Sequence, residues 1–366
     1  MRILLVSPYF FPHRGGVEQF NLELSKYLAK SHDLTVLSSK FNSEKESEYF
    51  LGFKIVRIPH FNLLGGTLPV PKSNLIVKKI IDSSNFETII TSTRFFPINF
   101  LITFYANRRK LKHVHIEHGS GFATLRNRLL SLISKVYDLI IGRYVLRSAD
   151  VVFGISKKSV DFAKSLGARR TDLFYNSVDC KFFDRTTNKK NHDRIIIAFI
   201  GRFIHAKGIH DLIEVFKTIE GENLVLKIVG AGNYEHKLKE LSKADKRIKF
   251  IVEPSREQIR DLLCATDIFV NPSYNEGLPT SVLEAGASSC AAIATDVGGT
   301  SEIIEHNKSG LLIRPADRGK LCLYLKKLIN DKALRLSFSK ELNKTINNKF
   351  CFDHNAANFQ SKIEKI

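Results

Sequence analysis

The chain has 366 residues, which is enough for two domains that each bury a hydrophobic core. Hydrophobic residues make up 43% of the chain and aromatic residues 10%, which excludes a largely disordered protein. The formal net charge of +19 at pH 7 indicates attraction to an anionic partner, and leaves nucleic acid, phosphate-bearing small molecules and anionic lipid open.

In the first half of the chain, short apolar runs alternate with longer amphipathic segments. The first run begins like a signal peptide, but Ser7 and Pro8 interrupt it too early, so we interpret it as a buried strand. The segment Val17–Lys30 has the period of a helix. Such alternation predicts a parallel sheet with helices on both faces. The strands predicted here are Ile3–Ser7, Leu34–Leu37, Lys54–Ile58, Thr88–Thr91, His113–Glu117 and Val151–Gly154.

A polar segment without periodicity then interrupts the alternation, and we interpret residues 186–194 as a linker between domains. The alternation restarts beyond it, with helices predicted at His210–Ile219 and Ala333–Phe350. The strands predicted in this half are Ile195–Ile200, Val225–Val229, Ile248–Val252, Ile268–Asn271 and Ala291–Thr295.

The fold class predicted from this pattern is α/β, with two Rossmann-like, doubly wound domains that face a central cleft. The N-terminal domain is predicted to span residues 1–185 and the C-terminal domain residues 195–349. The tail, residues 350–366, is too short for another strand–helix unit, and we expect it to pack back on the N-terminal domain. Open sheets of this type bind ligands at the carboxyl ends of their strands.

The five cysteines are scattered and show no Cys-x-x-Cys spacing. An odd number without a pattern predicts free thiols in a reducing compartment rather than a disulfide framework. No apolar run approaches the roughly 20 residues that a membrane-spanning helix needs. We therefore expect a cytoplasmic protein.

Two glycines, Gly15 and Gly16, follow the first predicted strand and precede a predicted helix. They would let the backbone approach a ligand closely, and the start of the helix would offer unpaired N–H groups to a phosphate. The spacing differs from Gly-x-Gly-x-x-Gly, which argues against an NAD site. A tight connection with no ligand is the alternative interpretation.

Two cations, Arg202 and Lys207, follow the first strand of the second domain. A guanidinium and an ammonium group together suit a diphosphate, although two solvated surface cations would give the same pattern. Gly230 and Gly232 follow the next strand, where they would admit a base or a ribose. An ordinary glycine-rich turn explains these two residues nearly as well.

The most informative motif runs from Asn271 to Ala285, where a strand ends, a Glu-Gly loop follows and Pro279 suits the first turn of a helix. Glu276 lies in this loop and Glu284 inside the helix. Two acids that flank a Gly-x-Pro helix start indicate a ligand site more strongly than two acids that merely have the same separation in the sequence. The backbone N–H groups expected to face the ligand belong to Gly277, Leu278 and Thr280.

In this order, the motifs resemble the retaining nucleotide-sugar glycosyltransferases of family 4, which have the GT-B fold. The resemblance covers nearly the whole chain and is densest from Gly201 to Gly310. It departs from the family pattern at Ser177, where the family often has Gly, and at Cys290-Ala291, which replaces Gly-x-Pro.

The resemblance implies a role for each motif. Glu276 would hold hydroxyls of the donor sugar and Glu284 the hydroxyls of the ribose. Arg202 and Lys207 would neutralise the diphosphate, with Gly16 and its neighbours closing on it from the N-terminal domain. His118 matches the family's cleft histidine beside the reacting sugar. The alternative is a structural histidine at a strand end, with its ring nitrogens hydrogen-bonded within the protein.

We therefore predict a retaining, metal-independent hexosyltransferase without a cofactor. Its donor would be a nucleotide-diphosphate sugar, and its acceptor a glycan or lipid-linked glycan in the synthesis of cell-surface polysaccharide, lipopolysaccharide or glycolipid. The sequence holds no Asp-x-Asp pair, so nothing in it suggests a chelated metal ion. Two acids on a sugar also occur in hydrolases, but one of these acids is assigned to the ribose.

The segment Phe122–Ser148 is amphipathic and basic, with cations that include Arg126 and Arg128. Together with the net charge it favours an anionic membrane surface as a partner, so the protein could be peripheral on the inner face of the cytoplasmic membrane. A solvated helix face packed on the domain is the alternative.

Two other kinds of function remain open. One is a nucleotide-sugar epimerase of the same fold, which would use the donor without an acceptor. The other is a non-catalytic basic protein that binds nucleic acid or a membrane. We expect no nucleic acid, because cations interleaved with aromatic residues and known recognition modules are both lacking.

Overall fold

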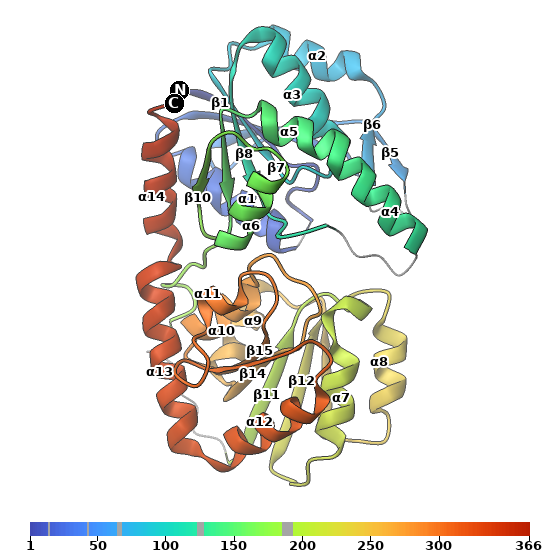
Figure 1. Ribbon diagram of the computed structural model, residues 1–366, viewed down its shortest axis with the longest axis vertical. Coiled ribbons are helices and arrows are strands. Elements are labelled where there is room, and N and C mark those ends of the chain that lie inside the picture. Colours follow the sequence, from blue (N-terminus) through green and yellow to red (C-terminus); the bar gives the residue numbers. More distant parts are fainter. Residues whose placement is uncertain (14, 42–43, 64–67, 123–127, 185–192) are drawn as a thin grey trace. The chain divides into compact units, whose positions relative to one another are not determined.

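A computed structural model describes the whole chain except residues 14, 42–43, 64–67, 123–127 and 185–192 (Figure 1). The chain divides into an N-terminal unit, Met1–Tyr175 with Asp353–Ile366, and a C-terminal unit, Asn176–Phe352. The division falls earlier than the expected boundary at residue 185, because the segment that follows Asn176 bonds to the C-terminal unit. Most of the expected linker, residues 186–192, lies outside the described residues.

The N-terminal unit is built on a sheet of eight strands in the order β10-β9-β8-β7-β1-β2-β4-β3. All neighbours are parallel except β3 and β4. A separate antiparallel pair, β5 and β6, was not predicted. The strands are β1 (Arg2–Val6), β2 (Asp33–Ser39), β3 (Ser47–Phe50), β4 (Phe53–Ile58), β5 (His60–Leu63), β6 (Leu68–Pro71), β7 (Thr88–Ser92), β8 (Lys112–Glu117), β9 (Val151–Gly154) and β10 (Thr171–Leu173).

Helices cover both faces of this sheet. Leu4 and Val6 of β1 share a buried cluster with residues of α2 and α3, while Ile3 and Leu5, which point to the opposite face, are fully buried as well. The last helix, α14, packs Phe359 on Phe174 with ring centroids 4.3 Å apart. The helices are α1 (Gly16–Leu28), α2 (Asn74–Ser83), α3 (Pro97–Arg109), α4 (Arg128–Tyr137), a π-helical turn η1 (Asp138–Gly142), α5 (Arg143–Ser148), α6 (Lys157–Ser165) and α14 (Phe352–Ile363).

The C-terminal unit has a parallel sheet of six strands in the order β13-β12-β11-β14-β15-β16. The strands are β11 (Ile195–Ile200), β12 (Leu224–Gly230), β13 (Ile248–Val252), β14 (Ile268–Asn271), β15 (Ala291–Thr295) and β16 (Leu311–Ile313). The helices are a short 3-10 turn η2 (His205–Lys207), α7 (Ile209–Lys217), α8 (Glu235–Ser242), α9 (Arg256–Cys264), α10 (Thr280–Ala287), α11 (Thr300–Ile303), α12 (Arg318–Asn330) and α13 (Lys332–Lys349).

Both sheets confirm the prediction of two Rossmann-like α/β domains. In each sheet the strand order reverses once, between β1 and β7 in the N-terminal unit and between β11 and β14 in the C-terminal unit. The loops that leave the two central strands diverge at such a point, and the crevice between them is where open sheets bind ligands. The reversals therefore fix where a site is expected in each unit.

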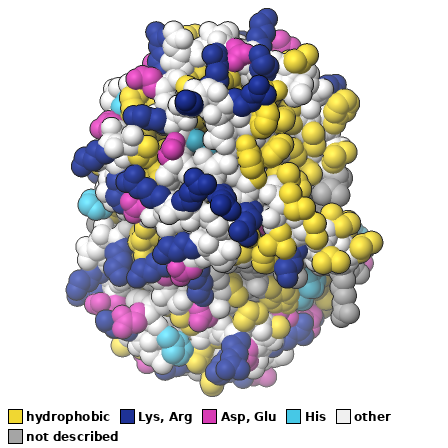
Figure 2. All heavy atoms as spheres, turned by 45° about the horizontal axis from the view of Figure 1, so that its top comes forward, with side chains coloured by type: hydrophobic (Ala, Val, Ile, Leu, Met, Phe, Trp, Pro, Cys, Tyr) yellow, Lys and Arg dark blue, Asp and Glu magenta, His cyan; other side chains and the backbone are white. Residues whose placement is uncertain are grey.

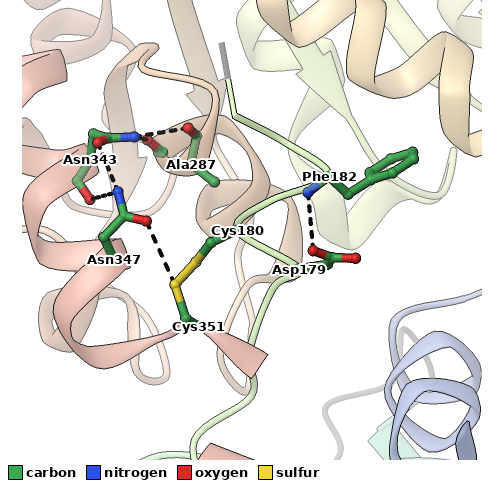
Figure 3. The surroundings of a disulfide bond; sticks show 8 residues. Asp179, Cys180, Phe182, Ala287, Asn343, Asn347 and Cys351 are labelled. Atoms are coloured by element: carbon green, nitrogen blue, oxygen red, sulfur yellow. Dashed lines mark hydrogen bonds between the residues drawn. A yellow bond between two sulfur atoms is a disulfide. The ribbon is translucent and has the colours of Figure 1, made fainter. Parts of the chain in front are cut away.

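The expectation of free thiols is wrong for two cysteines, because Cys180 and Cys351 form a disulfide (Figure 3). They are 171 residues apart in the sequence, so their spacing gave no sign of the pairing. Val178 forms a parallel bridge with Cys351, which brings the two segments together. On the adjoining helix α13, Asn343 donates hydrogen bonds to the carbonyl groups of Gly286 and Ala287 at the end of α10.

Candidate functional site

The loops after β11 and β14 are joined at the strand-order reversal of the C-terminal unit. The N–H of Tyr274 donates to the carbonyl oxygen of Ala206 at 2.8 Å. Lys207 Nζ lies 2.6 Å from Glu276 Oε1, and only 19% and 11% of these two side chains are exposed. The structure thus brings together two residues whose sequence motifs predicted a single ligand.

Arg202, the second predicted cation, is exposed just after β11. Its guanidinium group forms no ion pair or side-chain hydrogen bond with any part of the chain that the structure describes. An exposed cation at the carboxyl end of a central strand can bind an anion without breaking an internal contact.

The backbone N–H groups expected to face a ligand lie in the loop before α10 and at the first residue of the helix. The helix begins at Thr280, and Pro279 is its N-cap residue rather than part of its first turn. Within the described residues, no acceptor bonds to the N–H groups of Gly277, Leu278 or Thr280. The first N–H groups of a helix have no partner within the helix, so they can bind an anion.

Asn176 supports this loop, and the sequence motifs gave it no role. Its side-chain Nδ2 donates to the carbonyl oxygen of Leu278 at 3.0 Å and to Thr280 Oγ1 at 2.8 Å. In the sequence, this part of the chain stood out only for Ser177, next to Asn176. The contact spans more than 100 residues of sequence, and only the fold reveals it.

Glu284 lies half-buried on α10 and makes no ion pair or side-chain hydrogen bond with the rest of the described chain. Burial raises the pKa of its carboxyl group to about 7, and the positive charge of Arg256 only partly offsets this increase. A partly buried carboxyl group without a partner can accept hydrogen bonds from hydroxyl groups of a ligand.

Gly230 and Gly232 have a packing role. Both have a positive φ, and a Cβ atom would lie 1.9 Å from the carbonyl oxygen of Gly201 at the first and 2.5 Å from that of Phe203 at the second. The space that these glycines leave is therefore filled by the loop after β11. Their predicted contact with the nucleoside stays a prediction, and any such contact would use their backbone.

A polar network behind the site carries no signal in the sequence. The Tyr274 hydroxyl group donates to Asp211 Oδ2 at 2.5 Å, and Arg318 Nε donates to Asp211 Oδ1 at 2.5 Å. Burial and the neighbouring Asp211 raise the pKa of Tyr274, so the hydroxyl group keeps its proton. The network fixes the loop after β14 on α7, and no sequence pattern pairs residues 63 positions apart.

In the N-terminal unit, Gly15 is the N-cap residue of α1 and Gly16 its first residue. Gly15 has no side chain that could cap this helix. A Cβ atom on Gly15 would lie 2.1 Å from Glu18 Oε2, so the carboxylate of Glu18 lies at the helix start where a phosphate was predicted. A ligand phosphate at this position would require the Glu18 side chain to move.

His118 lies just after β8, beside the strand-order reversal of the same unit. Its Nε2 is 2.9 Å from Ser92 Oγ, and Ser92 Oγ also accepts a hydrogen bond from Asn21 Nδ2 at 3.1 Å. Burial lowers the pKa of His118 to about 4, so the ring is neutral at pH 7. If Ser92 donates its proton to Nε2, the ring proton is on Nδ1, which forms no hydrogen bond with another described residue.

A buried ionic cluster holds the segment around His118. Arg94 Nη1 donates to Glu117 Oε1 at 2.7 Å and Arg94 Nη2 to Asp138 Oδ2 at 2.8 Å. Glu117 also accepts the N–H of Gly119, and Arg94 keeps the pKa of its carboxyl group low, at about 2. The residues on both sides of His118 are therefore fixed to the sheet.

The described residues contain neither a metal-binding cluster nor a membrane-spanning helix. No group of three His, Cys, Asp or Glu side chains there is placed to hold a metal ion. Nor does any helix of that part of the chain have the length and apolar character to cross a membrane.

Comparison with known families gives two adjoining matches. Residues 14–182 match the model "Glycosyltransferase Family 4", and residues 181–345 match "Glycosyl transferases group 1". An uncharacterized glycosyltransferase of Methanocaldococcus jannaschii is 25% identical over all of this chain and 99% of its own length. A phosphatidylinositol N-acetylglucosaminyltransferase protein of Arabidopsis thaliana is 25% identical over 83% of this chain and 69% of its own length.

Solved structures give the same fold. A sucrose-phosphate synthase from Thermosynechococcus elongatus matches with a TM-score of 0.83 and 18% identity, over 100% of this chain and 98% of its own. HepE of Anabaena, in complex with UDP and glucose, matches with a TM-score of 0.82 and 16% identity over the full length of both chains. These likenesses show the GT-B fold. The two family matches together cover residues 14–345, and they show that the chain belongs to the family 4 glycosyltransferases.

Proposed function

We propose that the protein is a retaining, metal-independent glycosyltransferase that moves a hexose-type sugar from a nucleotide-diphosphate donor to a glycan or lipid-linked glycan. The observation that carries the donor site is the Lys207–Glu276 contact of 2.6 Å at the reversal of the strand order. Around it lie an exposed arginine, a helix start with free N–H groups and a half-buried acid. This combination suits a diphosphate flanked by two hydroxyl-bearing sugars.

In this proposal each group binds one part of the donor. Glu276 accepts hydrogen bonds from the hydroxyl groups of the sugar, and Lys207 holds that carboxylate in place. Glu284 accepts hydrogen bonds from the ribose. Arg202 and the N–H groups of Gly277, Leu278 and Thr280 bind the diphosphate, and the start of α1 at Gly15 and Gly16 is the proposed contribution of the N-terminal unit.

The chemical step breaks the bond between the anomeric carbon and the terminal phosphate of the donor. Negative charge then develops on that phosphate, and fixed cations and N–H groups stabilise it without a metal ion. His118, neutral and with its ring held by Ser92, is proposed to donate a hydrogen bond from Nδ1 to the reacting sugar. Retention follows if the nucleoside diphosphate leaves and a hydroxyl oxygen of the acceptor attacks the anomeric carbon on the same face, with the hydroxyl proton passing to the departing phosphate.

The acceptor is proposed to be part of cell-surface polysaccharide, lipopolysaccharide or glycolipid. Support comes from the names of relatives: one is a phosphatidylinositol N-acetylglucosaminyltransferase protein, and TuaC of Bacillus subtilis is a putative teichuronic acid biosynthesis glycosyltransferase. The site of action is proposed to be the cytoplasm, at the inner face of the membrane.

Thermal shift with a panel of nucleotide-diphosphate sugars tests the donor site. A true donor raises the melting temperature, because it binds only the folded protein. Glu276→Ala is expected to reduce the shift and to abolish transfer, whereas Glu240→Ala, at an exposed acid on α8, is expected to match the wild type. If no donor raises the melting temperature and Glu276→Ala transfers as well as the wild type, the proposal is wrong. Donor turnover without an acceptor would favour the epimerase.

A further inference from the structure

The helix α4 and the turn η1 are oriented with their polar side inward. Ser134, Asp138 and Gly142, spaced four residues apart on one side of the helix, are buried. The apolar side chains of the other side are exposed by 44% to 64%, and they are Leu129, Leu132, Ile133, Val136, Leu139 and Ile140. A surface helix of a globular protein normally buries its apolar stripe. This segment does the reverse.

An ion pair fixes that orientation. Asp138 accepts hydrogen bonds from Arg94 Nε at 3.1 Å and Nη2 at 2.8 Å, and Arg94 also binds Glu117. All three side chains are nearly inaccessible to water. Turning the helix over would separate buried charges from their partner, which is strongly unfavourable. The apolar side is therefore held outward by the fold.

The chain on either side of this helix is strongly basic. Residues 95–149 contain two acids, Glu117 and Asp138, and both are buried against Arg94. The same stretch contains nine cations, and those of them on α4 and α5 whose side chains are described are exposed. The nine are Arg108, Arg109, Lys110, Lys112, Arg126, Arg128, Lys135, Arg143 and Arg147. Cations beside an apolar stripe complement an anionic lipid surface.

The apolar surface extends beyond α4. Phe104 of α3, Leu75 of α2, and Phe61 and Leu63 of β5 are also exposed. Figure 2 shows a band of hydrophobic side chains with Lys and Arg side chains beside it. Single exposed apolar residues are ordinary, whereas a contiguous patch marks a surface that another body covers.

We propose that the apolar face of α4 and η1, the side chains of Leu129 to Ile140 named above, inserts into the headgroup region of an anionic bilayer. The helix lies in the plane of the interface, because residues 128–142 of α4 and η1 are too few to cross a membrane. The surrounding cations bind the lipid headgroups. This inference deepens the acceptor part of the proposed function, but it stands on α4 and not on the donor site.

Flotation with vesicles tests this docking surface. The full chain is mixed with vesicles of equal parts phosphatidylglycerol and phosphatidylcholine, or of phosphatidylcholine alone. The wild type is expected to float with the anionic vesicles and to bind more weakly as salt is raised. The triple substitution Leu132→Ser, Ile133→Ser and Ile140→Ser leaves the charge unchanged, and it is expected to weaken binding at least tenfold. The matched control, Leu323→Ser with Leu336→Ser, removes exposed leucines of α12 and α13 and is expected to float like the wild type.

Three results would overturn the inference. The wild type could fail to float with anionic vesicles, or the triple variant could float equally well. Alternatively, sedimentation could show that the wild type is a dimer that the triple variant splits, in which case a second copy covers α4. The thermal shift by a nucleotide sugar is expected to be the same in the triple variant, so failure of the donor site and failure of membrane docking are distinguishable.

Discussion

At the scale of single residues, the two acids of the donor site differ in their surroundings. Glu276 is paired with Lys207, so its charge is already balanced. Glu284 is half-buried and pairs with no cation of the described residues, and its pKa is raised to about 7. The two carboxyl groups thus have different environments. That of Glu276 lies beside a cation, whereas that of Glu284 exchanges its proton near neutral pH.

Glu284 therefore predicts a pH dependence. Its ionised form accepts hydrogen bonds from the ribose, so donor affinity is expected to fall about tenfold for each pH unit below the pKa. A raised folded-state pKa contributes stability at low pH that is lost as pH rises through about 7. Glu284→Gln is thus expected to abolish the pH dependence of donor binding and to melt no lower than the wild type at pH 8. Titration calorimetry and thermal melts from pH 5.5 to 8.5 measure both.

The control for this prediction is Glu240→Gln, at an exposed acid, which is expected to keep the pH profile of the wild type. An unchanged donor affinity between pH 6 and pH 8 in the wild type would contradict the assignment of Glu284.

At the scale of elements, the site depends on the hydrogen bonds that hold the loop after β14 against the loop after β11 and against α7. Tyr274 bonds through its backbone to Ala206 and through its hydroxyl group to Asp211. These hydrogen bonds bring Lys207 and Glu276, which lie on the two loops, into contact. The distance between the two side chains therefore depends on the positions of both loops.

Tyr274→Phe tests the contribution of the hydrogen bond between the Tyr274 hydroxyl group and Asp211. The substitution removes a hydrogen bond to a carboxylate, worth roughly 1.5–3 kcal/mol. We expect a lower melting temperature and a several-fold weaker donor affinity. Tyr49→Phe, at a tyrosine that is 82% exposed, is the matched control. Equal donor affinity in Tyr274→Phe and the wild type would mean that the loop needs no such contact.

The elements that the sequence predicted well are the buried parallel strands. The bounds of β9, β11, β14 and β15 match the predicted ranges, because a strand buried on both faces is a continuous apolar run. The bounds of β13, a partly exposed edge strand, match as well. The elements that were missed are short or lie at edges, where polar and apolar residues mix: β3, β5, β6, β10 and β16. The tail, expected only to pack, forms α14.

At the scale of the whole molecule, the sequence motifs located the candidate site but not its support. Motifs that follow strands predicted Glu276, Lys207 and Arg202, because the strand order places the ends of β11 and β14 side by side. The contacts of Asn176 and the Cys180–Cys351 disulfide join segments more than 100 residues apart. The outward orientation of the α4 apolar face likewise depends on Arg94, which no period within the helix reveals.

The most direct test is the release of nucleoside diphosphate from the donor that the thermal shift selects, measured with a polyprenyl-linked or glycan acceptor. Arg202→Ala is expected to lower kcat by on the order of 10²–10³, because an exposed guanidinium is proposed to stabilise the leaving diphosphate. Arg169→Ala, at an exposed arginine of the N-terminal unit, is expected to leave the rate unchanged. Full activity of Arg202→Ala, with sugar still transferred, would contradict a donor site between β11 and β14.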